Sequence, residues 1–151
     1  MMNLGAELPE LLPLAAEWAQ SQETVILATG RALTATESGL AVAVGVREPD
    51  RVRILIVQQL PQPQHAALRA AANQTGLLGP AIAGVTFGHG IYIRGRAISN
   101  RLVSHELRHV HQYEEAGSIA AFLATYLEQI VTFTYAHAPL ELDARRHERD
   151  H

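Results

Sequence analysis

The sequence predicts a single α+β domain in which mainly antiparallel strands come first and helices follow. The chain has 151 residues, of which 48% are hydrophobic, and this fits one domain built around a hydrophobic core. Residues 23–96 hold short runs of β-branched and small apolar residues, separated by glycine and proline. From Ser99 onward the apolar spacing becomes helical. Strands followed by helices are typical of the α+β class, and because no repeat or linker divides residues 1–151, we expect one domain.

The first part of the chain predicts one helix and then several strands. Residues 7–20 place leucine, alanine and tryptophan side chains on one side of an amphipathic helix. The segments ETVILATGRAL (23–33) and GLAVAVGV (39–46) are rich in β-branched and small apolar residues, which favours strands. REPD (47–50) predicts a turn, and the alternation in RVRILIVQQL (51–60) predicts a further strand.

The middle of the chain predicts a short helix and a glycine-containing strand. The helix covers residues 65–72 and ends in the loop 76–80, which contains glycine and proline. AGVTFGHGIYIRGR (83–96) combines strand-forming residues with glycines. This pattern predicts a strand with a bulge, or with a close approach of another part of the backbone.

Three helices are predicted after this strand. Ser99 or Asn100 can cap a helix that runs to Gly117, which is a natural residue to follow a helix. Ser118 can cap the second helix, and Pro139 stands where the first turn of the third begins.

The composition excludes several classes of function. A net charge of −3 provides no basic surface for nucleic acid, so we expect no nucleic-acid partner. The N-terminus lacks the basic segment of a secretory signal, and the apolar run 118–136 contains Glu128 and Gln129 near its middle. We therefore expect a cytoplasmic protein without a membrane span. Cysteine is absent, so any metal must be held by imidazole and carboxylate groups.

The segment SHELRHVHQYEEAG (104–117) contains the residues with the clearest chemistry. His105, Glu106 and His109 stand in the order H-E-x-x-H. Residues four apart lie on one face of a helix, so His105 and His109 can present two imidazoles to one ion. Glu106 is rotated by about 100° from His105, which places it beside a metal-bound water and not among the ligands. The motif arises by chance at this composition with a probability of roughly 0.03, and the capped helix around it strengthens the interpretation.

A third ligand is needed, because catalytic zinc usually has three protein ligands and one position for water. His111 points about 200° from His109 and cannot bind the same ion on an unbroken helix. His137, Glu141 and Asp143 lie in YAHAPLELDARR, a segment that a further helix can carry back across the site. The residues alone leave these three candidates open.

The segment HELRHVHQYEEAG followed by YAHAPLELDAR resembles the zincin metallopeptidases, and most closely their gluzincin branch. It is also similar to a group of small bacterial zincin-like proteins, in which an H-E-x-x-H-x-x-Q-Y helix precedes a P-L-E-x-[ED]-A segment. The resemblance covers residues 84–146. It implies that His105, His109 and Glu141 bind Zn²⁺, that Glu106 is the general base, and that a peptide or protein is hydrolysed.

The resemblance also implies how the site is supported. The E-x-x-A spacing of Glu141 and Ala144 is similar to that of membrane-bound prenyl-protein proteases, which continue with aspartate where this chain has Arg145. Asp143 or a backbone carbonyl would then have to orient a zinc-binding histidine. In zincins an edge strand before the helix holds extended substrate, and VTFGHGIYI (85–93) is the candidate here.

Several further polar residues are candidates for supporting roles. Gln112 shares the helix face of the two histidines and can donate to a ligand or to substrate. Four residues are candidate donors to an oxyanion, namely Tyr113, Tyr135, His89 and Arg145. The terminal RRHERDH (145–151) predicts a frayed polar tail.

The main hypothesis is therefore a zinc-dependent hydrolase that cleaves peptide bonds. The alternative is a zincin-fold protein that binds a metal or a partner without catalysis. A large open groove above His105 and His109 would favour the enzyme, whereas a filled cleft would favour the binding protein. A histidine-rich helix without metal is the third possibility, and it predicts equal exposure of His105 and His111. The substrate and the oligomeric state stay open.

Overall fold

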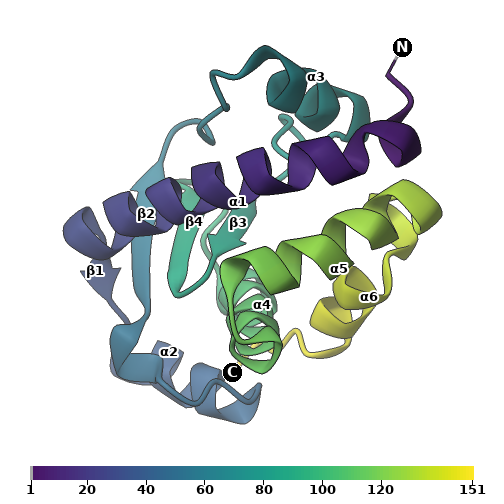
Figure 1. Cartoon of the computed structure of the whole chain (residues 1–151). Coiled ribbons are helices and arrows are strands. Elements are labelled where there is room, and N and C mark those ends of the chain that lie inside the picture. The colour runs from purple at the N-terminus through teal and green to yellow at the C-terminus, as the bar shows by residue number, and fades with distance from the viewer. Residues whose placement is uncertain (1) are drawn as a thin grey trace.

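The computed structural model describes residues 2–151, and this part of the chain forms six α-helices, two 3-10 helices and one four-stranded sheet (Figure 1). The α+β class predicted from the sequence is confirmed. The helices are α1 (Leu4–Thr29), α2 (Ala35–Ala43), α3 (Ala66–Thr75), α4 (Asn100–Ala116), α5 (Ile119–Phe133) and α6 (Pro139–Arg146). The strands are β1 (Arg31–Ala32), β2 (Arg53–Val57), β3 (Gly84–Phe87) and β4 (Gly90–Arg94), and the 3-10 helices are Pro49–Arg51 and Tyr135–His137.

The sheet is mixed and has the strand order β1-β2-β4-β3. The outer pairs are antiparallel, whereas the central pair of β2 and β4 is parallel. A parallel pair needs a crossover connection, and α3 lies in the chain between β2 and the β3–β4 hairpin. Two of the three pairings are antiparallel, as the prediction of mainly antiparallel strands requires, but the central pairing is parallel. The order of elements departs from the prediction at α2, which lies between β1 and β2 where a strand was expected.

Helices cover both faces of the sheet (Figure 1). α1 crosses one face, where Tyr92 and Phe87 join a core shared with α5. α2 and α4 cover the other face, where Ile91 and Ile93 are fully buried. Successive residues of β4 thus enter opposite cores, as expected for a strand that is buried on both faces.

Helix α1 is longer than the sequence predicts. It spans 26 residues instead of residues 7–20, and it takes in most of the segment 23–33 that predicts a strand. Pro9 and Pro13 lie on its exposed side, so the carbonyls that lose a helical partner can face water. Ile26 is fully buried against Gly90 of β4. The strand prediction is wrong because this packing outweighs the weak local preference of β-branched residues.

Helix α2 occupies most of the segment 39–46, so the strand predicted there is also wrong. The helix begins with a capping box, in which the Thr34 hydroxyl accepts from the Glu37 N–H and the Glu37 carboxylate accepts from the Thr34 N–H. Leu40, Ala41 and Val44 then enter the core at helical spacing.

Strands β3 and β4 form a tight hairpin. Phe87 pairs with Gly90, which leaves Gly88 and His89 as a two-residue turn. Gly88 has a φ of +63°, and a Cβ there would collide with the carboxylate of Glu23 in α1. The sequence therefore predicts the close approach correctly, but the bulge is wrong because the chain turns at this point.

The three C-terminal helices begin where predicted, and α4 also ends where predicted. The Ser99 and Ser118 side chains cap α4 and α5, each by accepting a backbone N–H of the first turn. Gly117 follows α4 in the left-handed conformation, and Pro139 lies in the first turn of α6. Within residues 2–151, no single helix is both long enough and apolar enough to cross a membrane.

Candidate metal centre

The buried rear face of α4 positions the histidines. Val103, Leu107 and Val110 are fully buried in the core between α2, α4 and the sheet. His105 and His109 lie on another face of the same helix, one turn apart, and their ring centroids are 5.0 Å from each other. The core therefore sets the direction in which both imidazoles point.

Glu141 of α6 lies between the two imidazoles. Its Oε1 is 3.1 Å from His105 Nε2, and its Oε2 is 3.0 Å from His109 Nε2. One potential ligand atom from each residue lies within 4.8 Å of the others, and all three side chains are buried. Two imidazole nitrogens and one carboxylate are a donor set found in catalytic zinc sites.

Glu148 holds the imidazole of His105 from behind. Its Oε2 is 2.8 Å from His105 Nδ1, so the ring donates at Nδ1 while its Nε2 points at Glu141. A carboxylate behind a ligating histidine fixes the tautomer and makes the ring more basic. For His105 this role falls to Glu148, and not to Asp143 or a backbone carbonyl, the two groups expected from the sequence to orient a histidine.

Gln112 holds the imidazole of His109 in the same way. Its Oε1 is 2.7 Å from His109 Nδ1, and its Nε2 donates to Asp143 Oδ2 at 2.8 Å. Arg108 Nε donates to the same Asp143 oxygen, also at 2.8 Å. Hydrogen bonds thus connect Arg108 through Asp143 and Gln112 to the imidazole of His109. They orient its Nε2 toward Glu141.

The three buried groups shift one another's ionisation. Burial disfavours a charged imidazole, but hydrogen bonds and charges from Glu141 and Glu106 outweigh it and raise the pKa of His105 to about 9. Burial and the same carboxylates act on His109, and its pKa is raised too. Burial opposes the charge of Glu141, yet the histidines hold the pKa of its carboxyl well below the usual value. A metal ion that bound these ligands would therefore have to displace protons from the two histidines.

Glu106 faces the same space without lying between the histidines. Its Oε2 is 3.9 Å from His105 Nε2, and its Oε1 accepts a 2.9 Å hydrogen bond from the Thr86 hydroxyl of β3. Gly84 of β3 packs against this side chain, and a Cβ there would lie 3.3 Å from Glu106 Cγ. Strand β3 thus fixes the carboxylate beside the triad of His105, His109 and Glu141.

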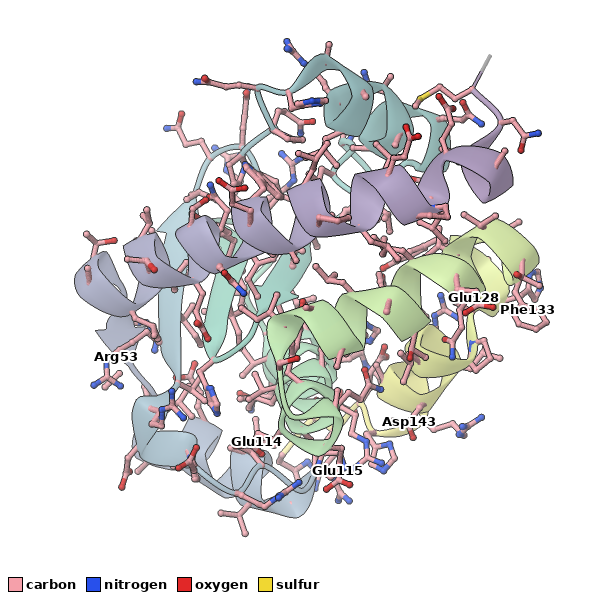
Figure 2. The ribbon with its side chains drawn as sticks, viewed as in Figure 1. Arg53, Glu114, Glu115, Glu128, Phe133 and Asp143 are labelled. Carbon is pink, nitrogen blue, oxygen red and sulfur yellow. The ribbon has the colours of Figure 1, made fainter. Side chains whose placement is uncertain are left out.

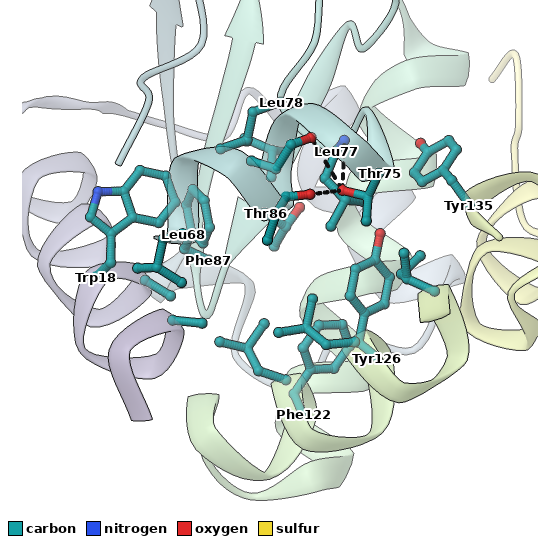
Figure 3. Close-up of a pocket in the computed structure, with 18 of the residues that line it drawn as sticks. Trp18, Leu68, Thr75, Leu77, Leu78, Thr86, Phe87, Phe122, Tyr126 and Tyr135 are labelled. Atoms are coloured by element: carbon teal, nitrogen blue, oxygen red, sulfur yellow. Dashed lines mark hydrogen bonds between the residues drawn. The ribbon is translucent and has the colours of Figure 1, made fainter. Parts of the chain in front are cut away.

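A cavity of about 150 Å³ reaches this group of residues (Figure 3). Apolar side chains of α1, α3, β3 and α5 form most of its wall, and Glu106, His109 and Glu141 contribute charged groups. Tyr126 of α5 also lines it and donates to Glu141 Oε2 at 2.7 Å. The space beside the histidines is therefore partly open.

The other candidates for the third ligand lie away from the histidine pair. Asp143 of α6 accepts from Arg108 and Gln112 of α4 and contacts neither imidazole of the pair. His137 is exposed in the 3-10 helix before α6. His111 Nδ1 lies 2.9 Å from the Gly45 carbonyl, on a different side of α4, and it is less buried than His105. Of the three open candidates, only Glu141 meets both histidines.

Three of the four candidate oxyanion donors are engaged elsewhere. The Tyr113 hydroxyl donates to a carbonyl of β3. His89 pairs with a glutamate near the end of α4. Arg145 donates to carbonyls of the 3-10 helix that precedes α6. Tyr113 and Tyr135 both line the cavity with Glu106 and Glu141, and of these two tyrosines only Tyr113 is engaged with β3.

A second group of possible ligands, Glu48, His89 and Glu114, lies near the end of α4 (Figure 2). The Glu114 carboxylate accepts the backbone N–H groups of Arg47 and Glu48. Glu48 is exposed and pairs with Arg51. These contacts tie the segment before β2 to α4, and we assign the group this structural role.

Two residues at the site were not predicted from the sequence. Glu148 lies in the terminal segment predicted to fray, but Arg149 N–H donates to Ser104 Oγ at 2.8 Å and Arg101 pairs with Glu148. Glu148 lies beyond the end of α6, so no helical spacing in the sequence indicated its position at the site. Tyr126 stands in an apolar run, where a buried hydroxyl needs a partner.

Comparison with known proteins gives no relative: no protein-family model, curated protein or solved structure matches this chain. Its function is therefore argued from the site, because a fold by itself does not define a function.

Proposed function

We propose that this chain is a zincin-type, zinc-dependent hydrolase that cleaves peptide bonds. The observation that carries the proposal is the convergence of His105, His109 and Glu141, with Glu106 beside them at the wall of a cavity. A structural ion cluster would need neither a neighbouring free carboxylate oxygen nor access to a cavity. The partly open cavity also favours an enzyme over a zincin-fold protein that only binds a metal or partner.

The donor set fits zinc. Both histidines have Nδ1 engaged behind the ring, so each presents Nε2, and one carboxylate completes a set of three. Zinc at these residues would supply a Lewis acid that polarises the substrate carbonyl and lowers the pKa of a bound water. The protein's own contribution is to hold these ligands and to place a base next to them.

Glu106 is the proposed base. The Thr86 hydroxyl occupies Oε1, which leaves Oε2 as the oxygen that can take a proton from the attacking water. The same carboxyl then gives that proton to the nitrogen that leaves when the C–N bond breaks. Gly84 keeps the carboxylate in position because no side chain separates β3 from it.

Strand β3 is the proposed support for an extended substrate. The Arg94 N–H donates to the Ala83 carbonyl across the hairpin. Because such pairs alternate along an antiparallel ladder, the backbone groups of Gly84 and Thr86 face away from β4. The Thr86 carbonyl is taken by Tyr113, which leaves the Thr86 N–H and the Gly84 groups for a substrate main chain.

Elemental analysis of protein purified without an affinity tag tests the metal. We expect about one Zn²⁺ per chain, as a site of three ligands and a water implies. His105→Ala should abolish zinc binding, and His111→Ala is the matched control that should keep it. Equal loss in both variants would show that the wrong histidines are assigned.

Glu106→Gln tests the chemistry. The amide can still accept from Thr86 but cannot take a proton from water, so we expect zinc to stay bound and hydrolysis of a library of unstructured peptides to fall by about 10²- to 10⁴-fold. Loss of zinc in this variant would make Glu106 a ligand or a structural residue, and the mechanism would fail.

A further inference from the structure

The cavity beside the metal centre is an elongated channel. Its wall includes Leu4, Leu8, Leu11, Ala15, Trp18 and Ala19 of α1, which are spaced so that they form one face of that helix. At 1.5 Å per residue, this face extends for roughly 22 Å. Residues of α5, α3 and β3 form the rest of the wall (Figures 1 and 3).

The channel is also narrow. A compact apolar cavity of about 150 Å³ is large enough to hold one benzene ring. Here about the same volume is spread along several turns of α1. A cavity of this volume that contacts several turns of α1 favours an unbranched alkyl chain over a ring.

Polar groups occur at one part of the channel. The charged residues in its wall are Glu106, His109 and Glu141, which belong to the metal centre. The hydroxyl of Thr75, further along the wall, is already bonded to carbonyls of its own helix. Away from β3, along α1 and α3, a peptide main chain would lose its hydrogen bonds to water without replacement, which costs free energy for every buried amide. A hydrocarbon chain loses none.

We propose that the substrate carries a straight aliphatic acyl chain, with the chain in this channel and the amide at the metal centre. The inference rests on the hydrolase function proposed above and names its substrate class as an N-acyl amide. Water adds to the acyl carbon, the C–N bond breaks, and Glu106 carries one proton from the water to the departing nitrogen. The products are a carboxylic acid and an amine.

Calorimetric titration with neutral primary amides tests the channel. Hexanamide, octanamide and decanamide add no charge beside Glu106 and Glu141. Each added methylene should tighten binding by about fourfold, equivalent to ~0.8 kcal/mol. Heptanamide should bind more tightly than cyclohexanecarboxamide, which has the same number of carbons in a ring. Equal or tighter binding of the ring, or affinity independent of chain length, would overturn the proposal.

A pair of variants in α3 locates the binding. Ala71 lines the channel, whereas the neighbouring Ala70 is exposed and does not. Ala71→Leu should weaken decanamide binding by about tenfold or more, because it displaces about two methylene groups. Ala70→Leu should leave binding unchanged, and equal effects of the two variants would place the ligand elsewhere.

The titrations are made on zinc-free and zinc-loaded protein, so that the two proposals fail separately. If amide affinity depends on chain length but the protein binds no zinc, the acyl-chain channel is supported and the hydrolase proposal is rejected. If the protein binds zinc and hydrolyses peptides but amide affinity does not depend on chain length, the hydrolase proposal is supported and the acyl-chain substrate is rejected.

Discussion

Glu141 is the residue on which the proposed metal centre depends most. Its two carboxylate oxygens contact one histidine each, and the Tyr126 hydroxyl donates a hydrogen bond to Oε2. We expect Glu141→Ala to weaken zinc binding by about tenfold or more, because a ligand is lost outright. Asp143→Ala should have a smaller effect, because Asp143 acts on His109 only through Gln112.

Competition with a chromophoric chelator measures both zinc affinities. If Asp143→Ala lost the metal and Glu141→Ala kept it, the ligand on α6 would be wrongly assigned. The centre would then be a site of two histidines and one aspartate.

Glu148 acts on the metal centre through the ring of His105. Removing a residue that orients a ligating histidine typically costs about 10- to 100-fold in metal affinity, and we expect this range for Glu148→Ala. Glu148→Gln should recover part of the loss, because the amide oxygen still accepts from Nδ1. Glu128→Ala is the control, since Glu128 is exposed on α5 (Figure 2). The same chelator titration reports all three, and an unchanged affinity in Glu148→Ala would exclude this role.

At the scale of elements, the contact of β3 with α4 links the sheet to the proposed base. Gly84→Ala would bring a Cβ to 3.3 Å from Glu106 Cγ and 3.2 Å from the Tyr92 carbonyl oxygen. We expect peptide hydrolysis to fall while zinc binding is retained, because the carboxylate must move and the histidines need not. Steady-state kinetics and zinc content are measured on the same preparation.

Gly39→Ala in α2 is the matched control for this change. A Cβ at Gly39 meets no atom within 4 Å. Alanine in a helix interior is favoured over glycine by about 0.5–1 kcal/mol, so this variant should be slightly more stable and equally active. A similar loss of hydrolysis in both variants would show that the effect does not come from Glu106.

The elements also show which parts of the fold the sequence can predict. Helices α4, α5 and α6 are predicted correctly because a serine cap or a first-turn proline marks where each begins. Helix α2 has an equally clear mark in Thr34 and Glu37, which the strand prediction from the β-branched run did not use. Helix α1 ends at Gly30, but its length also depends on the packing of Ile26 on β4, which the sequence does not show.

The candidate site is predictable to a similar degree. The spacing of His105, Glu106 and His109 follows from one helix, so local geometry suffices to predict their relation. Glu141 was assigned by resemblance, and the residues alone left it open with two others. Glu148 and Tyr126 come from a segment and a helix whose placement depends on tertiary packing, so spacing along the chain could not select them.

At the scale of the whole molecule, stability without zinc should depend on pH. The pKa of His105 rises from 6.5 to about 9 on folding, so its pairing stabilises the protein fully below pH 6.5. This contribution is lost as the pH rises through about 9. We therefore expect the melting temperature of the zinc-free protein to fall across this range, measured by calorimetry with a chelator present.

Zinc should have the opposite dependence, because it competes with the protons on the histidine nitrogens. Its apparent affinity should increase as the pH rises toward about 9. The gain in melting temperature on adding zinc should therefore grow over the same range. If the zinc-induced gain in melting temperature does not change with pH, the histidines of the zinc-free protein are not protonated as assigned here.

The contact between His105 and Glu148 has a consequence for how the protein is made. The two residues are separated by 43 positions along the chain. At the usual pace of translation, about 5–20 residues per second, the ribosome needs roughly 2 to 9 seconds to pass from one to the other. When His105 is synthesised, α4 is not yet complete, and this histidine has neither Glu141 nor Glu148 beside it. The proposed metal centre can therefore assemble only after Glu148 has been synthesised, and the proposed hydrolysis could begin only after that point.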